Sequence, residues 1–248
     1  MTLVQILAAT FAGGVLSVFA AAALSLTLLA RWAPRLVSYA VGVLLGVAFL
    51  DLLPEAVDGL GARTALATCL GGLLGFFTLE KLSLWRHAHA EAEPGHAAHA
   101  HKPAGMMVVV GDAMHNSVDG VLIAAAFLVD AKLGWAVALG VIAHEIPHEI
   151  GAFMVLLDSG YSRRAALAYN ALSGCAAIAG GVLGYVTLTP GDPMVARVLA
   201  ISAASFIYIS VADLIPGLHQ HWKPRDAAVQ GLLIAAGVAG AALLTVHS

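Results

Sequence analysis

Two short polar clusters interrupt otherwise apolar stretches of this chain, HNSVDG at 115–120 and HEIPHEIG at 144–151. They carry seven side chains of kinds that commonly bind metal ions: His115, Asn116, Asp119, His144, Glu145, His148 and Glu149. A charged side chain at the centre of a bilayer costs about 2.5–3.5 kcal/mol on insertion scales. Several such groups in apolar segments must therefore line a cavity, pair with one another or bind an ion.

Helical spacing places these side chains on strips that can face each other. In the first cluster His115 and Asp119 are four residues apart and share one helix face, and Asp112 extends the strip by one turn. The second cluster holds two pairs with the same spacing, His144 with His148 and Glu145 with Glu149. Imidazole favours zinc, copper, iron and nickel, whereas purely oxygen sites favour magnesium and calcium. The clusters predict a transition-metal site between two helices.

The composition is that of a membrane protein. Of 248 residues, 60% are hydrophobic and 11% are charged, against about 25% charged in an ordinary soluble domain. A helix needs about 20 apolar residues to cross the hydrocarbon core. Eight stretches qualify, at 3–30, 35–57, 64–85, 105–129, 133–157, 164–187, 194–217 and 226–246. We predict an all-α integral membrane protein with one domain over 1–248, whose first apolar run is a retained helix. No basic patch favours nucleic acid as a partner.

The positions of Lys and Arg predict an orientation. Eight spans place both termini on one side, and with the termini outside, the inner loops hold nine of the twelve Lys and Arg residues. Cytoplasmic loops carry such an excess. We therefore expect both termini outside the cytoplasm, in a plasma membrane of the bacterial inner-membrane type.

The segment 86–104 is a long polar stretch, predicted to be a flexible cytoplasmic loop because its composition cannot pack a core. Histidine-rich tracts bind transition metals loosely. The segment is interpreted either as a metal-capturing loop or as a solvated linker of biased composition. Its histidines are His87, His89, His96, His99 and His101.

A short internal repeat relates two of the expected spans. DLLP at 51–54 in span 2 is echoed by DLIP at 213–216 in span 7, and HNSVDG in span 4 resembles HEIPHE in span 5. In each pair the two spans run in opposite directions. Such a pattern is typical of inverted repeats with the substrate site at their interface. Asp51, Glu55 and Asp213 lie near span ends, where they belong either to an ion path or to headgroup water.

The paired clusters resemble the ZIP (Zrt-/Irt-like) divalent-metal transporters, and most closely the branch with HExPHE in its fifth span. Supporting features are DLLPEA at 51–56, LEK at 79–81, the histidine-rich loop and FIYIS at 206–210. The resemblance implies eight helices and transport of zinc, iron or manganese into the cytoplasm, with cadmium as a further cation. It implies a primary site of His115, Asp119, His144 and His148, with Asn116 and Glu145 contributing to an adjoining one.

Two departures from the family pattern bear on the site. Ala152 stands where this branch usually has Asp, and Ala177 stands where binuclear members place a Glu ligand. We therefore expect one tight site, with Glu149 and Asp112 in the ion path or behind the ligands. Runs of small residues such as Gly71-Gly72 and Gly180-Gly181 allow close helix contacts, either within one subunit or in a homodimer.

Two alternatives use the same residues. HEIPH at 144–148 is an HExxH sequence, which in zinc proteases supplies two His ligands and a Glu base. An intramembrane metalloprotease would leave HNSVDG and the repeat unexplained, so we predict a protein that is not an enzyme. The third interpretation is a metal sensor or storage protein.

Overall fold

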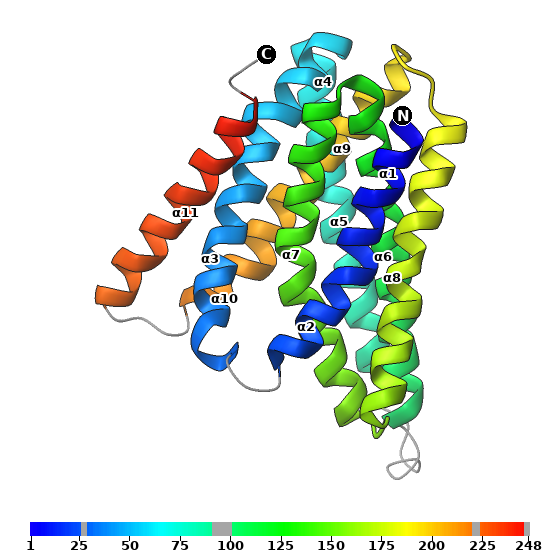
Figure 1. Ribbon diagram of the computed structural model, residues 1–248, viewed down its shortest axis with the longest axis vertical. Helices are drawn as coiled ribbons and strands as arrows, with labels where there is room; N and C mark the ends of the chain where they lie inside the picture. Colours follow the sequence, from blue (N-terminus) through cyan, green and yellow to red (C-terminus); the bar gives the residue numbers. More distant parts are fainter. Residues whose placement is uncertain (26–28, 91–100, 220–223, 246–248) are drawn as a thin grey trace.

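The computed structural model describes residues 1–25, 29–90, 101–219 and 224–245, and is built from helices throughout those ranges (Figure 1). Several helices continue directly into one another through short π-helical segments, which are labelled η. In chain order the elements are α1 Thr2–Thr10, η1 Phe11–Leu16, α2 Ser17–Ser25, α3 Leu29–Val47, η2 Ala48–Leu52, α4 Leu53–Leu60, α5 Ala62–Ala90, α6 His101–Val129, α7 Ala131–Asp158, α8 Arg163–Thr187, α9 Pro193–Tyr208, η3 Ile209–Leu214, α10 Ile215–His219 and α11 Pro224–Thr245.

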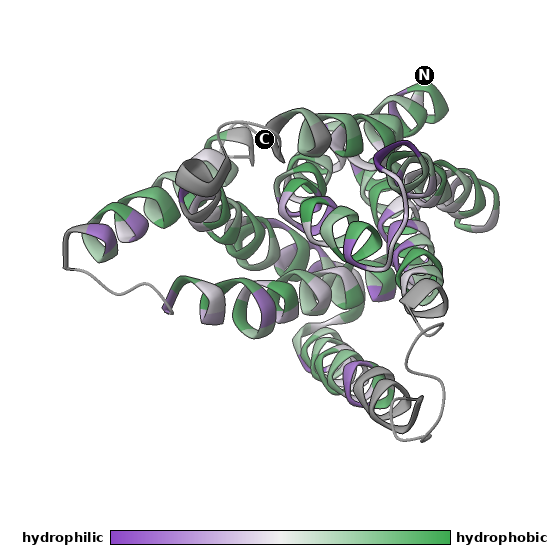
Figure 2. Cartoon of the chain, turned by 90° about the horizontal axis from the view of Figure 1, so that it is seen from below, coloured by the Kyte–Doolittle hydropathy of each residue, from purple (hydrophilic) through white to green (hydrophobic). Residues whose placement is uncertain are grey.

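The predicted all-α membrane fold is confirmed. Within the described ranges, eight helical segments are long and apolar enough to cross a bilayer: 2–21, 35–60, 62–82, 105–129, 131–158, 163–187, 193–219 and 226–243. Apolar residues dominate the outward faces of the helices, and several hydrophilic residues lie between the central ones (Figure 2). The chain therefore has the surface that a bilayer requires and a polar interior that needs an explanation.

Two boundaries differ from those expected. The sequence predicted a break at Arg31–Arg35, but α3 begins at Leu29 and includes this segment. Similarly, α5 continues to Ala90 and α6 begins at His101, so that both helices extend into the segment expected as a loop. His87 and His89 are thus helical, His101 opens α6, and His96 and His99 lie outside the described residues. Ala, Leu and Lys are good helix formers, and their propensity extends the helices beyond the apolar spans.

The DLLP and DLIP segments share a local geometry as well as a sequence. Each Asp lies in a π-helical segment, Asp51 in η2 and Asp213 in η3, and each Pro follows at the second position of the next helix. Proline has no N–H and leaves the carbonyl four residues earlier without its helical donor, which a wider turn accommodates. The two spans run in opposite directions through the bundle (Figure 1).

Glycines let α8 approach its neighbours with backbone against backbone. A Cβ on Gly180 would lie 2.0 Å from the carbonyl oxygen of Ser117 in α6, and one on Gly120 would lie 2.0 Å from that of Ala177 in α8. On another side, a Cβ on Gly14 of η1 would lie 2.2 Å from the carbonyl oxygen of Gly174. The two contacts between α6 and α8 fix the height and rotation of α6, the helix that carries the first polar cluster.

The variant Gly180→Ala should be destabilised by about 1–3 kcal/mol, because the added methyl group forces α6 and α8 apart. Gly71→Ala is the matched control, since a Cβ there meets nothing within 4 Å and alanine raises helix propensity. Thermal unfolding of the purified variants in detergent measures both. A Gly180→Ala protein as stable as Gly71→Ala would contradict the packing described here.

Candidate metal site

Four side chains from α6 and α7 converge in the interior of the bundle: His115, Asp119, His144 and Glu145. Each offers one ligand atom, and all four atoms lie within 4.8 Å of one another. His115 Nε2 lies 3.2 Å from Glu145 Oε1, and His144 Nε2 lies 3.2 Å from Asp119 Oδ2. The two Nε2 atoms are 3.2 Å apart. This set, the histidine cluster, brings together two imidazoles and two carboxylates, a combination suited to a first-row divalent ion.

The backbone orients His144 for metal binding. Its Nδ1 lies 3.0 Å from the carbonyl oxygen of Gly140, one turn earlier in α7. Donation of Nδ1–H to this carbonyl leaves the lone pair on Nε2, the atom that faces Asp119 and Glu145. In metal sites, a hydrogen bond from the ring nitrogen that does not bind the metal fixes the orientation of the histidine ring.

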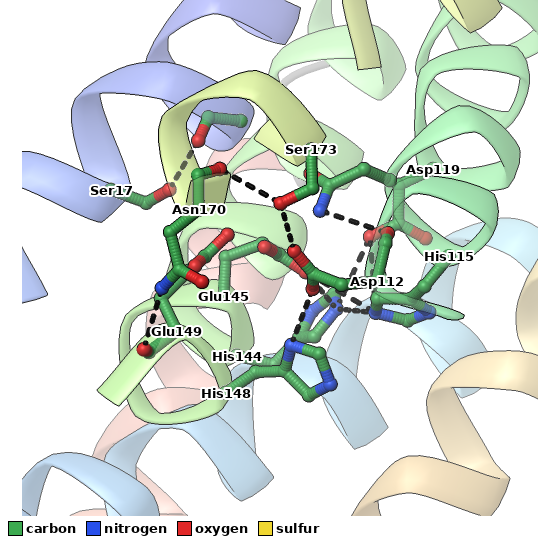
Figure 3. A network of polar contacts seen from close by, with 12 residues as sticks. Ser17, Asp112, His115, Asp119, His144, Glu145, His148, Glu149, Asn170 and Ser173 are labelled. Carbon is green, nitrogen blue, oxygen red and sulfur yellow. Dashed lines mark hydrogen bonds and ion pairs between the residues drawn. The ribbon is translucent and has the colours of Figure 1, made fainter. Parts of the chain in front are cut away.

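His148 lies beside the histidine cluster and contacts a different carboxylate. Its ring centroid is 5.0 Å from that of His115, and its Nδ1 is 3.2 Å from Asp112 Oδ1. Asp112 in turn accepts a hydrogen bond from the hydroxyl group of Ser173 in α8 (Figure 3). The arrangement leaves Nε2 of His148 as a further nitrogen donor next to the four clustered groups.

The side chains of the histidine cluster and of His148 differ in exposure. The side chains of Asp119, His144 and Glu145 are at most 1% exposed, whereas those of His115 and His148 are 26% and 46% exposed. His148 lies one turn after His144, toward the Asp158 end of α7, which is the lower end of the bundle in Figure 1. The most exposed side chain of this group therefore lies toward that end of the bundle.

An aromatic ring packs against the site on the α9 side. Phe206 of α9 is fully buried, and its ring centroid lies 5.9 Å from that of His144. A Cβ on Gly140 would come within 2.8 Å of the Phe206 ring, so the glycine makes room for it. Phe206 belongs to a buried apolar core that also includes Leu44, Val47 and Val137.

The remaining predicted residues lie in three places. Asn116 is buried and donates a hydrogen bond to the backbone carbonyl of Asp112, one turn earlier in its own helix. Glu149 is buried on the side of the site that faces α8 (Figure 3). Asp51 and Glu55 line a cavity of about 600 Å³ at the opposite end of the bundle, together with Asp58, Asp130 and Lys132. Asp213 is exposed in η3.

Sequence reasoning missed two polar residues of α8, Asn170 and Ser173. Both are buried, and Asn170 donates a hydrogen bond of 3.1 Å to the backbone carbonyl of Glu149. Their spacing of three residues on one face of an apolar span was the signal that could have found them. Ala177, one turn after Ser173, packs instead against Gly120 and next to Gly14.

A model of the ZIP zinc transporter family matches residues 85–245, which include all the residues of the histidine cluster. This chain belongs to the ZIP zinc transporter family. Zinc transporter ZIP13 of Mus musculus is 30% identical to this ZIP chain over 250 residues, which cover 85% of the chain and 69% of that protein.

Two further relatives are covered less completely. Zinc transporter ZIP13 of Pongo abelii is 30% identical over 219 residues, covering 82% of this ZIP chain and 64% of that protein. Zinc transporter ZIP5 of Homo sapiens is 37% identical over 145 residues, covering 56% of the chain and 27% of that protein. The chain thus spans less than two thirds of the length of both relatives.

Replacing His144 by Ala should weaken zinc binding at least about 100-fold, because it removes a ligand rather than one of the outer partners whose loss typically costs 10–100-fold. Competition between the purified protein and a zinc-binding dye measures this affinity. His219→Ala, at an exposed position in α10, is the matched control and should bind zinc as the unmodified protein does. Equal affinities in both variants would exclude His144 as a ligand.

Proposed function

We propose that this chain carries divalent transition-metal cations across a membrane, through a site formed by α6 and α7 in the middle of the bundle. The observation that carries the proposal is the convergence of four ligand atoms within 4.8 Å, in helices otherwise apolar enough to lie in lipid. Transporters commonly bind their substrate at a site near the middle of the membrane. Membership of the ZIP family and the names of the relatives as zinc transporters support it.

Zinc is the proposed principal substrate, with iron, manganese and cadmium as further ones. Two imidazoles and two carboxylates match the tetrahedral coordination that zinc prefers, and the neighbouring His148 adds another nitrogen. We assign His115, Asp119, His144 and Glu145 as the ligands in this conformation. His148 joins them as the cation enters or leaves, since it is the most exposed of these groups.

The exposure pattern supports a direction. With both termini outside, as the Lys and Arg distribution favours, the exposed His148 lies toward the cytoplasmic end of α7, and Phe206 packs against His144. This conformation is one from which a cation would be released into the cell. The cavity lined by Asp51 and Glu55 is on the exterior side and is the proposed entry.

Geometry argues against the metalloprotease alternative. In an HExxH protease both histidines bind one metal ion and the Glu acts as a base on water. Here Glu145 lies 3.2 Å from His115 and 3.4 Å from His144, among the ligand atoms, while His148 contacts Asp112. The site also needs two residues of HNSVDG, which a protease would not use.

Liposomes that contain the purified chain should take up zinc, and His148→Ala should reduce the initial rate about tenfold or more, since the exposed nitrogen donor is lost. His219→Ala should transport normally. Uptake is followed with a zinc-sensitive dye inside the vesicles. A His148→Ala rate equal to that of the unmodified chain would refute the assigned path, and peptide cleavage without zinc flux would favour the protease.

Replacing His87, His89, His96, His99 and His101 together by Ala should leave zinc uptake measurable at saturating zinc, because none of the five is among the residues assigned to the site. If this segment captures metal, half-maximal uptake should require a higher zinc concentration. The rate is measured as a function of zinc concentration in the same vesicles. Complete loss of uptake would instead place the segment in the transport path.

A further inference from the structure

A phenyl ring from outside the two ligand helices packs on a member of the histidine cluster. Phe206 of α9 is fully buried, and its ring centroid lies 5.9 Å from that of His144. The two ring planes are 63° apart, an edge-to-face contact of the kind that aromatic pairs prefer. The contact therefore has a defined geometry, and it involves a proposed metal ligand directly.

His144 differs from the other two imidazoles of this region in its burial. Its side chain is 1% exposed, whereas those of His115 and His148 are 26% and 46% exposed. A buried polar atom normally finds a hydrogen-bond partner within the protein. For Nδ1 of His144 this partner is the carbonyl oxygen of Gly140, at 3.0 Å. The bond determines which ring nitrogen of His144 is left for a cation, and water that reached the bond would compete with it.

Gly140 takes part in both contacts. Its carbonyl oxygen accepts the hydrogen bond from His144, and its lack of a side chain makes room for Phe206. A Cβ on Gly140 would lie 2.8 Å from Cε2 of the phenyl ring, closer than such atoms normally approach. The ring thus packs on the residue that accepts the bond and on the residue that donates it. Phe206 is therefore placed to shield this bond from water.

A second phenyl–glycine pair on α7 offers a comparison. Phe127 of α6 is 4% exposed and packs on Gly134 of α7, where a Cβ would lie 2.3 Å from the phenyl ring. Its aromatic neighbour is Trp135, with ring centroids 5.4 Å apart. The two pairs share their packing and differ in what lies beside the phenyl ring, a proposed metal ligand for Phe206 and a tryptophan for Phe127.

We propose that Phe206 is a positioning residue of the metal site. Its phenyl ring keeps water from the hydrogen bond between His144 and Gly140, and the protected bond holds Nε2 of His144 toward the cation. Phe206 has no ligand atom of its own and acts through His144. The inference rests on the proposed function in one respect, that His144 binds the transported cation.

Zinc affinity separates this role from packing alone. Phe206→Leu keeps an apolar side chain and removes the ring, so it should weaken zinc binding about tenfold, the lower end of the loss typical for residues that orient ligands. Phe127→Leu is the matched control, which should lower the Tm by a similar amount and bind zinc as the unmodified chain does. The full chain is purified in lipid nanodiscs, and a zinc-binding dye competes with it for the metal.

Proton exchange reports on the shielding itself. The chain is produced with isotope-labelled histidine, loaded with zinc and transferred to deuterated water, and the Nδ1–H signal of His144 is followed by nitrogen NMR. Its absence from His144→Ala assigns the signal. In Phe206→Leu this proton should exchange at least about tenfold faster than in the unmodified chain, because water reaches it without a larger opening of the structure. Phe127→Leu should leave the exchange rate unchanged.

Double variants test whether the two contacts act together. Gly140→Ala displaces the phenyl ring and should also weaken zinc binding. Because Gly140→Ala and Phe206→Leu disturb one contact, the loss of affinity in the double variant should be smaller than the product of the two single losses. Gly134→Ala is the control for the glycine and should bind zinc normally. Combined with Phe206→Leu, it should leave the effect of that substitution unchanged.

Equal zinc affinity in Phe206→Leu and Phe127→Leu, or an unchanged exchange rate in Phe206→Leu, would overturn the positioning role. If Phe206→Leu yields no folded protein, Gly140→Ala carries the same test against Gly134→Ala. A His144→Ala variant that binds zinc as the unmodified chain does would refute the proposed site. Loss of zinc in His144→Ala with full affinity in Phe206→Leu would refute the positioning role alone.

Discussion

Four carboxylates, those of Asp112, Asp119, Glu145 and Glu149, are buried close together among apolar helices, and this is the constraint on which the structure depends. Among the residues whose burial the structure describes, no Lys or Arg is buried. Burying a charge in a low-dielectric interior costs several kcal/mol, and carboxylates that lie close together also repel one another. The stabilisation comes from elsewhere, from the apolar core around Leu44, Val137 and Phe206 and from close helix packing. A bound cation removes the repulsion, and binding and stability are therefore linked in this chain.

Helix α8 carries no member of the histidine cluster, but it positions α6 and α7, the two helices that carry the cluster. Gly180 of α8 packs on the backbone of Ser117, which lies two residues after His115. Gly120, the residue after Asp119, packs on the backbone of Ala177 in α8. Contacts between backbones leave little room for rotation, since no flexible side chain separates the helices. From the same helix, Ser173 holds Asp112, which in turn contacts His148. α8 thus determines both the separation and the rotation of the ligand strips.

Much of the fold, and part of the site, could be predicted from the sequence. Span length and apolar content identify the membrane helices, and a spacing of four residues places His115 with Asp119. The pairing of His148 with Asp112 could not be foreseen, because it depends on Ser173 of a third helix and on which way each helix is rotated. For the same reason Glu145, expected in an adjoining site, lies among the four clustered ligand atoms. The end of α5 at Ala90 was not predicted, because residues with high helix propensity extend the helix beyond its apolar span.

The π-helical turns beside Pro54 and Pro216 give the two related spans a property that a regular helix lacks. Such a turn holds one residue more than an α-helical turn, and one residue corresponds to about 100° of rotation. If the wide turn shifts along the helix, the side chains between its old and new positions rotate onto another face of the helix, and the span stays continuous. Asp51 and Asp213 lie within these turns, at opposite ends of the bundle. Each of the two aspartates can thus be swivelled toward or away from the bundle axis by a local change in winding, while the packed helices on either side keep their places.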